Sequence, residues 1–235
     1  MLYIIAFLIA LCSYLLGSVN TSIILSRAFY GSDIRSSGSG NAGATNMLRT
    51  HGTKMAVATL LFDVLKGAVA VFIASMIDKF ALSAYDTTLI SGFESTYLLG
   101  SLRYIAGIFV VLGHDFPVYF DFRGGKGVAT SLGVMLVLDW QIGLIILALA
   151  LTIMAATRYV SLGSITAAAV YPFMLVAFII AGSEKLIDNI TYLFMAVVLA
   201  LLLIVKHRSN IVKLKNGNEN KLFSKKTENK EENEV

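Results

Sequence analysis

The chain has 235 residues, of which 57% are hydrophobic and only 14% are charged. A soluble domain is about 45–50% apolar and about 25% charged, so the composition excludes a soluble globular protein and indicates an integral membrane protein. The net charge of +4 does not indicate a nucleic-acid partner, because the basic residues fall at the ends of apolar runs. The single cysteine, Cys12, excludes an intrachain disulfide.

The apolar runs predict an all-α protein, a compact bundle of about seven membrane-spanning helices. The first run is expected to be a retained span, because it lacks a basic n-region and is longer than the apolar core of a signal peptide. Pro172 is expected to bend the sixth run, and residues 139–141 are expected to form an interfacial turn. The seven runs, in chain order, are 3–25, 55–77, 97–112, 128–138, 142–156, 165–181 and 190–205.

Alternation of the seven spans predicts the orientation. It puts most of the lysine and arginine residues on one side, which the positive-inside rule assigns to the cytoplasm. The N-terminus is then outside, the C-terminus is cytoplasmic, and residues 78–96 form a loop on the outer side. Residues 1–212 are expected to be a single transmembrane domain. Residues 213–235 are expected to be a polar cytoplasmic tail that is disordered at its end.

The first glycine-rich stretch, DIRSSGSGNAGATNMLR at residues 33–49, is not typical of a helix interior or a strand. Successive glycines permit positive φ, and they allow backbone N–H groups to come close to a ligand. With hydroxyls and Arg49 nearby, the stretch predicts a cradle for an anion, most often a phosphate. The alternative is a flexible surface linker.

The second stretch is FRGGKG, residues 122–127. It is not a Walker A motif, because Phe120 and Gly127 stand where that motif needs a glycine and a serine or threonine. The ammonium of Lys126 among glycines is suited to a phosphate oxygen. The alternative is that the basic residues only mark the cytoplasmic end of a span.

Polar side chains elsewhere also occur in helical pairs. His207 and Asn210 are three residues apart and share a helical face, which suits a hydrogen-bond relay, although KHR could also be an ordinary membrane-stop cluster. Asp63 and Lys66 lie inside the second span. An ionisable residue there costs about 2.5–3.5 kcal/mol, so we expect them to pair with each other and to support the first glycine-rich stretch.

Three further groups of polar residues are candidates for a functional role. His51 is read as incidental. His114 lacks the aspartate that a His-x4-Asp acyltransferase needs, because that position is Tyr119. The hydroxyl residues in RYVSLGSIT, Ser161 among them, could either cap the sixth span or point into a site.

Three long stretches together resemble the PlsY family, the bacterial acyl-phosphate:glycerol-3-phosphate acyltransferases. They are DIRSSGSGNAGATN, GHDFPVYFDFRGGKGVAT and HRSNIVKLKNGNE, and the resemblance extends to about residue 219. It implies a multi-pass enzyme of the bacterial plasma membrane with its active site facing the cytoplasm. The implied reaction moves a fatty acyl group from acyl phosphate to the sn-1 hydroxyl of glycerol 3-phosphate, giving lysophosphatidic acid and phosphate, the first step of phospholipid synthesis. The implied partners are these two substrates and membrane lipids, with no cofactor, metal or nucleic acid.

The same resemblance implies the site residues. Arg49 and Lys126 would carry the charge that binds phosphate, and the backbone amides of residues 38–43 would bind phosphate oxygens. His207, held by Asn210, would orient the acceptor hydroxyl or take its proton, and the departing phosphate could take that proton instead. The implied catalytic residues are Ser39, Arg49, Lys126, His207 and Asn210. The implied substrate-binding residues are Gly38, Gly40, Asn41, Gly43, Thr45, Asn46, Gly124, Gly125, Gly127 and Ser161.

The alternative function is a transporter of a small organophosphate. Transporters commonly contain internal repeats and helices interrupted near the membrane midplane. No convincing repeat is found in this sequence, and its glycine-rich stretches are predicted to cluster on one face.

Overall fold

The computed structural model describes residues 2–84, 101–183 and 186–222, and every regular element within these ranges is helical. The elements are α1 (Leu2–Ser18), α2 (Thr21–Tyr30), η1 (Ile34–Ser36), α3 (Ala44–His51), α4 (Thr53–Ala84), α6 (Leu102–Asp115), η2 (Val118–Phe120), α7 (Val128–Leu138), α8 (Trp140–Thr157), α9 (Val160–Ala181), η3 (Leu186–Asn189), α10 (Ile190–Lys206) and α11 (Arg208–Lys215).

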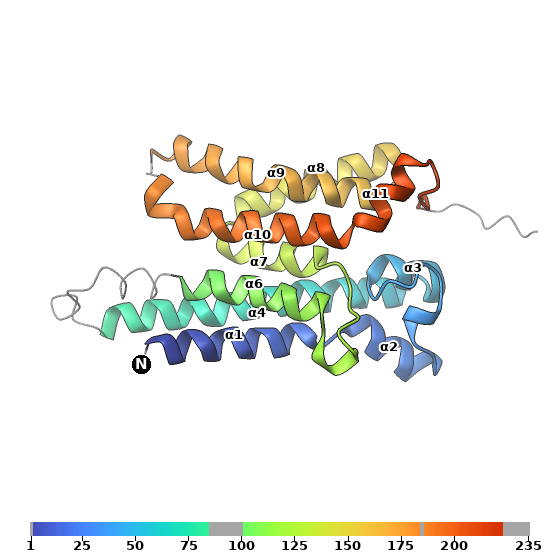
Figure 1. Cartoon of the computed structure of the whole chain (residues 1–235), viewed down its shortest axis with the longest axis horizontal. Helices are drawn as coiled ribbons and strands as arrows, with labels where there is room; N and C mark the ends of the chain where they lie inside the picture. Colours follow the sequence, from blue (N-terminus) through green and yellow to red (C-terminus); the bar gives the residue numbers. More distant parts are fainter. Residues whose placement is uncertain (1, 85–100, 184–185, 223–235) are drawn as a thin grey trace, which may run out of the picture.

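The long helices run side by side in two groups (Figure 1). Helices α1, α4 and α6 pack together in one group, and α8, α9 and α10 form the other. The short helix α7 lies between the groups and contacts both α4 and α8. The short helices α2, α3 and α11 lie together at one end of the bundle. The two groups therefore meet along α7 and at the direct contact between α6 and α10.

The helix lengths and their hydropathy identify a multi-pass membrane protein. In the part of the chain that the structure describes, four segments are long and apolar enough to cross a bilayer: Leu2–Tyr30, Thr53–Phe80, α8 and α9. Helices α10 and α11, which meet at a bend of 57°, make a fifth if they are counted together.

Two pairs of glycines let helix backbones approach closely. A Cβ on Gly17 of α1 would lie 2.1 Å from the carbonyl oxygen of Val110, and one on Gly113 of α6 would lie 2.1 Å from that of Tyr14. Small residues are the usual means by which membrane helices achieve such contacts. The pair Gly67 and Gly133 does the same between α4 and α7.

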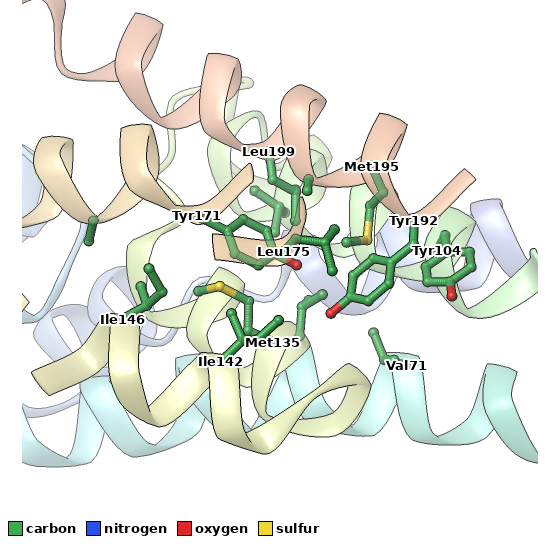
Figure 2. Close-up of a cluster of buried hydrophobic side chains, with 14 of the residues drawn as sticks. Val71, Tyr104, Met135, Ile142, Ile146, Tyr171, Leu175, Tyr192, Met195 and Leu199 are labelled. Atoms are coloured by element: carbon green, nitrogen blue, oxygen red, sulfur yellow. The ribbon is translucent and has the colours of Figure 1, made fainter. Parts of the chain in front are cut away.

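A buried apolar cluster connects the two groups of helices (Figure 2). It includes Val71 of α4, Met135 of α7, Leu175 of α9 and Met195 of α10, all at most 7% exposed. Tyr192 of α10 stacks on the ring of Tyr104, with ring centroids 5.0 Å apart. This cluster fixes the position of α9 and α10 relative to α4 and α6.

The structure corrects the first three expected segments. The first run is broken, because the Asn20 side chain accepts a hydrogen bond from the backbone N–H of Ile23 and begins a new helix, α2. The first glycine-rich stretch, residues 33–49, is not typical of a helix interior in sequence, yet its last six residues belong to the helix α3. Helix α4 continues to Ala84, so residues 78–84 of the expected outer loop are helical, whereas residues 85–100 lie outside the described ranges.

The later segments agree more closely, with shifted ends. The run 128–138 is α7 as expected. Asp139 does not begin a three-residue turn. Its side chain instead accepts hydrogen bonds from the N–H groups of Gln141 and Ile142 and caps α8, which begins at Trp140. Helix α9 begins at Val160, earlier than predicted, and Pro172 lies inside it. Helix α11 begins at Arg208 and crosses the expected boundary at residue 212, so the first residues of the expected tail, 213–215, are helical.

We predict that Gly133→Ala destabilises the protein. A helical Gly→Ala change alone favours the helix by about 1 kcal/mol, but the new Cβ would lie 2.0 Å from the backbone oxygen of Val64 and must push α7 away from α4. Such overpacking costs about 1–3 kcal/mol, so the clash should outweigh the gain. The measurement is the thermal unfolding midpoint of the purified protein in detergent. Ala148→Val, at an exposed position of α8, is the control, and an unchanged midpoint for Gly133→Ala would contradict the close packing.

Candidate active site

A cavity of about 1120 Å³ runs from the end of the bundle that carries α3 and α11 into the space between the two groups of helices. Its outer part is lined by Arg49, Lys126, Ser161 and His207, which come from four separate segments of the chain. Its inner part is lined by apolar side chains of α4, α7, α8, α9 and α10. The residues that the sequence singles out therefore meet at the polar end of one cavity.

Lys126 is the centre of a hydrogen-bond network at this polar end. Its Nζ donates to Oδ1 of Asn210 at 2.5 Å, and Nδ2 of Asn210 donates to Oε1 of Glu219 at 2.8 Å. The hydroxyl of Ser161 donates to the same carboxylate oxygen at 3.0 Å. Burial lowers the pKa of Lys126 to about 8; the charge of Glu219 acts in the opposite direction, and nearby cations add to the lowering.

His207 is buried against the base of this network, with 3% of its surface exposed. Its Nδ1 lies 2.7 Å from the carbonyl oxygen of Leu203. A carbonyl can only accept, so Nδ1 carries the proton and Nε2 is left with a free lone pair. Burial, and then the charge of Lys126, lowers the pKa of His207 to about 4, so the ring is neutral near pH 7. The prediction that Asn210 holds His207 is wrong, because Asn210 binds Lys126 and Glu219 instead.

Four helix N-termini also face the cavity, those of α3, α7, α9 and α11. In the described part of the chain, none of these four has a side-chain hydrogen bond at its N-cap, unlike α2 and α8. The first N–H groups of a helix have no partner within it, and the helix dipole makes this end positive. The polar end is thus suited to anions for a reason that the sequence motifs did not reveal.

The first glycine-rich stretch is folded around Asn46, which is fully buried. Oδ1 of Asn46 accepts from the N–H of Ser39 at 2.8 Å, and its Nδ2 donates to the carbonyl oxygens of Ile34 and Ser37. The N–H groups of Gly40 and Gly43 also donate to carbonyls within the stretch. Three of the amides expected to bind phosphate therefore donate within the protein, and Asn46 holds the stretch in shape.

The remaining residues of this stretch are placed as follows. Gly38 has φ of 60° and packs against Asn46, where a Cβ would lie 2.3 Å from Oδ1, and it does not line the cavity. Arg49 is exposed and lines the cavity, and its guanidinium donates to the carbonyl oxygen of Asn220 at 3.1 Å. The predicted residues that do line the cavity are Ser39, Gly40, Asn41, Gly43, Thr45, Asn46 and Arg49.

In the second stretch, Gly124, Gly125 and Gly127 all line the cavity. The N–H groups of the first two donate to the carbonyl oxygens of Asp115 and His114. A Cβ on Gly125 would lie 2.1 Å from Nε2 of His114. These two glycines therefore serve close packing of the backbone against the end of α6, and that packing fixes the position of Lys126.

A buried ionic cluster supports both stretches. Nζ of Lys66 lies 2.9 Å from Oδ1 of Asp63 and 2.9 Å from Nδ1 of His114, so the predicted pair is confirmed and His114 is an added member. Lys66 also donates to the carbonyl oxygen of Val19 at 2.9 Å, next to Asn20, whose amide contacts Ala42 in the first stretch. His51 stacks on Tyr30, away from this cluster.

The segment after α11 contributes to the site, which is not predicted from the sequence. The tail from about residue 216 is expected to be solvated, and most of residues 216–222 are indeed exposed. Two of its residues nevertheless contact the site: Glu219 binds Ser161 and Asn210, and the N–H of Leu222 donates to the carbonyl oxygen of Arg158. Oε2 of Glu219 is buried without a partner among the described residues. The available signal was the NGNE sequence within the third resembling stretch. The rest of the tail, 223–235, lies outside the described ranges.

Known proteins resemble this chain over nearly its whole length. The profile of the family described as "Glycerol-3-phosphate acyltransferase" matches residues 7–217. A protein of that name from Clostridioides difficile is 42% identical, over 93% of this chain and 96% of its own length. One from Thermoanaerobacter pseudethanolicus is also 42% identical, over 94% of this chain and 97% of its own length.

Two solved structures have the same fold. Both are crystal structures of PlsY, described as an integral membrane glycerol 3-phosphate acyltransferase, one in a glycerol 3-phosphate form and one in a lysophosphatidic acid form. They match with TM-scores of 0.76 and 0.73 at 35% and 34% identity, and each comparison covers 92% of this chain and 95% of the other. The chain therefore belongs to the glycerol-3-phosphate acyltransferase family, of which PlsY is a member.

Proposed function

We propose that this protein transfers a fatty acyl group from acyl phosphate to the sn-1 hydroxyl of glycerol 3-phosphate, which gives lysophosphatidic acid and phosphate. The observation that carries the proposal is one cavity with a cationic polar end and an apolar inner part. Such a cavity matches a donor that has a phosphate at one end and a hydrocarbon chain at the other. The family and its PlsY structures support glycerol 3-phosphate as the acceptor.

Electrostatics is the main contribution that the protein makes in this proposal. Each substrate carries about −1.5 to −2 charge if its phosphate behaves as a phosphomonoester, so the two repel each other. The cavity wall holds more cationic than acidic side chains: Arg49, Lys126, Lys206, Arg208 and Lys213 against Asp63 and Glu219. These charges and the four helix N-termini would hold both phosphates, and correct positioning would supply most of the acceleration.

The proposed chemical step needs no covalent enzyme intermediate, because acyl phosphate is a mixed anhydride with a good leaving group. The hydroxyl oxygen forms a bond to the acyl carbonyl carbon, the carbon–oxygen bond to phosphate breaks, and the hydroxyl proton leaves with the phosphate. His207 would accept a hydrogen bond from that hydroxyl at Nε2 and orient it. Its low pKa makes it a weak base, so orientation is the role that its environment supports.

We also propose that α6 and α7 cross the membrane, which gives seven spans with the N-terminus outside. The start of α3, the loop before α7, the turn before α9 and the start of α11 all lie at the same end of the bundle in Figure 1, as alternating spans require. The positive-inside rule assigns this basic end to the cytoplasm, in a bacterial plasma membrane. The active site would then face the cytoplasm.

Lys126→Ala and Arg49→Ala should each lower acyl transfer by about 10²-fold or more, because each removes a charge that holds a phosphate. The assay incubates purified protein in detergent with acyl phosphate and glycerol 3-phosphate, and measures released phosphate and lysophosphatidic acid. Lys54→Ala is the control, since Lys54 is exposed at the same end and does not line the cavity. Near-normal acyl transfer by either variant would contradict the proposal that the charge of that residue holds a phosphate. Uptake of glycerol 3-phosphate into liposomes without product would instead favour the transporter.

The pKa of Lys126 predicts a pH dependence for acceptor binding. The ammonium is present below about pH 8 and is lost above it, so KM for glycerol 3-phosphate should rise as pH increases beyond 8, by up to about tenfold per unit. Initial rates from pH 6.5 to about 9.5 measure this effect, with uncatalysed hydrolysis subtracted. Lys126→Arg stays charged throughout and should keep a flat profile. A wild-type profile as flat as that of the arginine variant would contradict the assignment.

His207→Ala should lower kcat by about 10²-fold or more without rescue at higher pH, because the lost function is orientation of a hydroxyl. The same assay, repeated across the pH range, gives the answer. Recovery of activity in proportion to hydroxide concentration would indicate that His207 is a general base instead.

A further inference from the structure

The apolar part of the cavity has a definite depth. On α9, Ser161 at the polar end and Tyr171 at the inner end both line the cavity and are ten residues apart. An α-helix rises 1.5 Å per residue, so they are about 15 Å apart along the axis. On α4, the lining residues Thr53 and Val64 are eleven residues apart, so the same rise per residue places them about 16 Å apart along the helix axis. The distances along α9 and α4 are therefore similar, and both indicate a cavity depth of about 15 Å.

Tyr171 lies at the inner end of the cavity. Together with Met135 of α7, Ile146 of α8 and Leu199 of α10, it is the deepest lining residue on its helix. Figure 2 draws the Tyr171 ring between Ile146 and Leu175. Leu175, one turn further along α9, is packed into the apolar cluster and is not part of the cavity wall. Tyr171 is 3% exposed and belongs to the buried apolar cluster, so its side chain is packed among its neighbours.

The wall of the cavity also reaches the outer surface of the bundle. Leu60 and Leu61 of α4 line the cavity and are 43% and 63% exposed, and Leu151 of α8 is 54% exposed. These exposed leucines belong to helices that are apolar enough to span the bilayer. A hydrocarbon chain can therefore enter sideways from the lipid, and an acyl chain is the occupant that this wall fits.

We propose that Tyr171 limits the length of the acyl chain that the enzyme accepts, an inference that rests on the proposed function. An extended chain advances about 1.3 Å per carbon with bonds of about 1.5 Å, so about 12 carbons reach from Ser161 to Tyr171. Longer chains must bend toward the exposed leucines. One methylene that does not fit an apolar pocket changes kcat/KM by about 10–200-fold, which is enough to set a preference.

The test measures kcat/KM for saturated acyl phosphates from decanoyl to icosanoyl phosphate, with glycerol 3-phosphate saturating. In wild-type protein we expect kcat/KM to fall above a certain chain length. Tyr171→Ala should shift this limit toward longer chains by about two or more carbons. The ratio of kcat/KM for long donors to kcat/KM for short donors should rise by at least about tenfold. Ala168→Leu, which narrows the lining about one turn nearer the polar end, should move the limit toward shorter chains. KM for glycerol 3-phosphate should not change in either variant.

Two control variants distinguish a specific role of Tyr171 at the inner end of the cavity from a general effect of substitutions in α9. Phe173→Ala removes an aromatic ring from the same helix at a position that is 76% exposed and does not line the cavity, and it should leave the length profile unchanged. Tyr171→Phe keeps the ring and should also leave it unchanged. If Tyr171→Ala does not fold, the shift in Ala168→Leu decides the question.

A wild-type enzyme without a length limit would overturn the inference, as would an unshifted profile in Ala168→Leu or in folded Tyr171→Ala. Either result would leave acyl transfer to glycerol 3-phosphate intact. Absence of transfer from every donor in the wild-type protein would instead reject the proposed function and this inference with it.

Discussion

The partly buried ammonium of Lys126 is the constraint on which the site depends. A charge out of water needs a hydrogen-bond partner, and Lys126 finds one in Asn210, which is held in turn by Glu219. Lys126 precedes α7, whereas Asn210 and Glu219 follow α10, so this contact joins the loop between α6 and α7 to the C-terminal segment. The carboxylate also binds Ser161 at the start of α9. One partly buried charge thus brings three distant parts of the chain to the polar end of the cavity.

Glycines and helix ends have different tasks at this site. Gly124 and Gly125 are needed for close packing, because their N–H groups donate to carbonyls at the end of α6 and a Cβ on Gly125 would strike His114. The positive character of the cavity comes from lysine and arginine side chains and from the N-termini of α3, α7, α9 and α11. The ionic cluster of Asp63, Lys66 and His114 lies behind both glycine-rich stretches and supports them from the side of α4.

Much of this arrangement could be predicted from the sequence, because its signals are local. Apolar runs located the long helices, and the glycine-rich stretches, together with Lys126 and His207, identified the polar end. The sequence could not show the break at Asn20, because a capping residue inside an apolar run does not change hydropathy. The partners of Asn210 could not be predicted either. Helical spacing indicated His207 as its partner, but α10 and α11 meet at a bend of 57°. Asn210, just after this bend, instead binds Lys126 and Glu219. Long-range contacts of this kind have no local pattern.

The central claim is that one cationic cavity holds two phosphorylated molecules at the same time. The most direct measurement is the affinity of the purified protein for glycerol 3-phosphate in the presence of a saturating acyl phosphonate, a donor analogue whose carbon bridge cannot be cleaved. We expect both molecules to bind together, so glycerol 3-phosphate should still bind when the analogue is saturating. Strict competition between the two, with no ternary complex at any concentration, would contradict it.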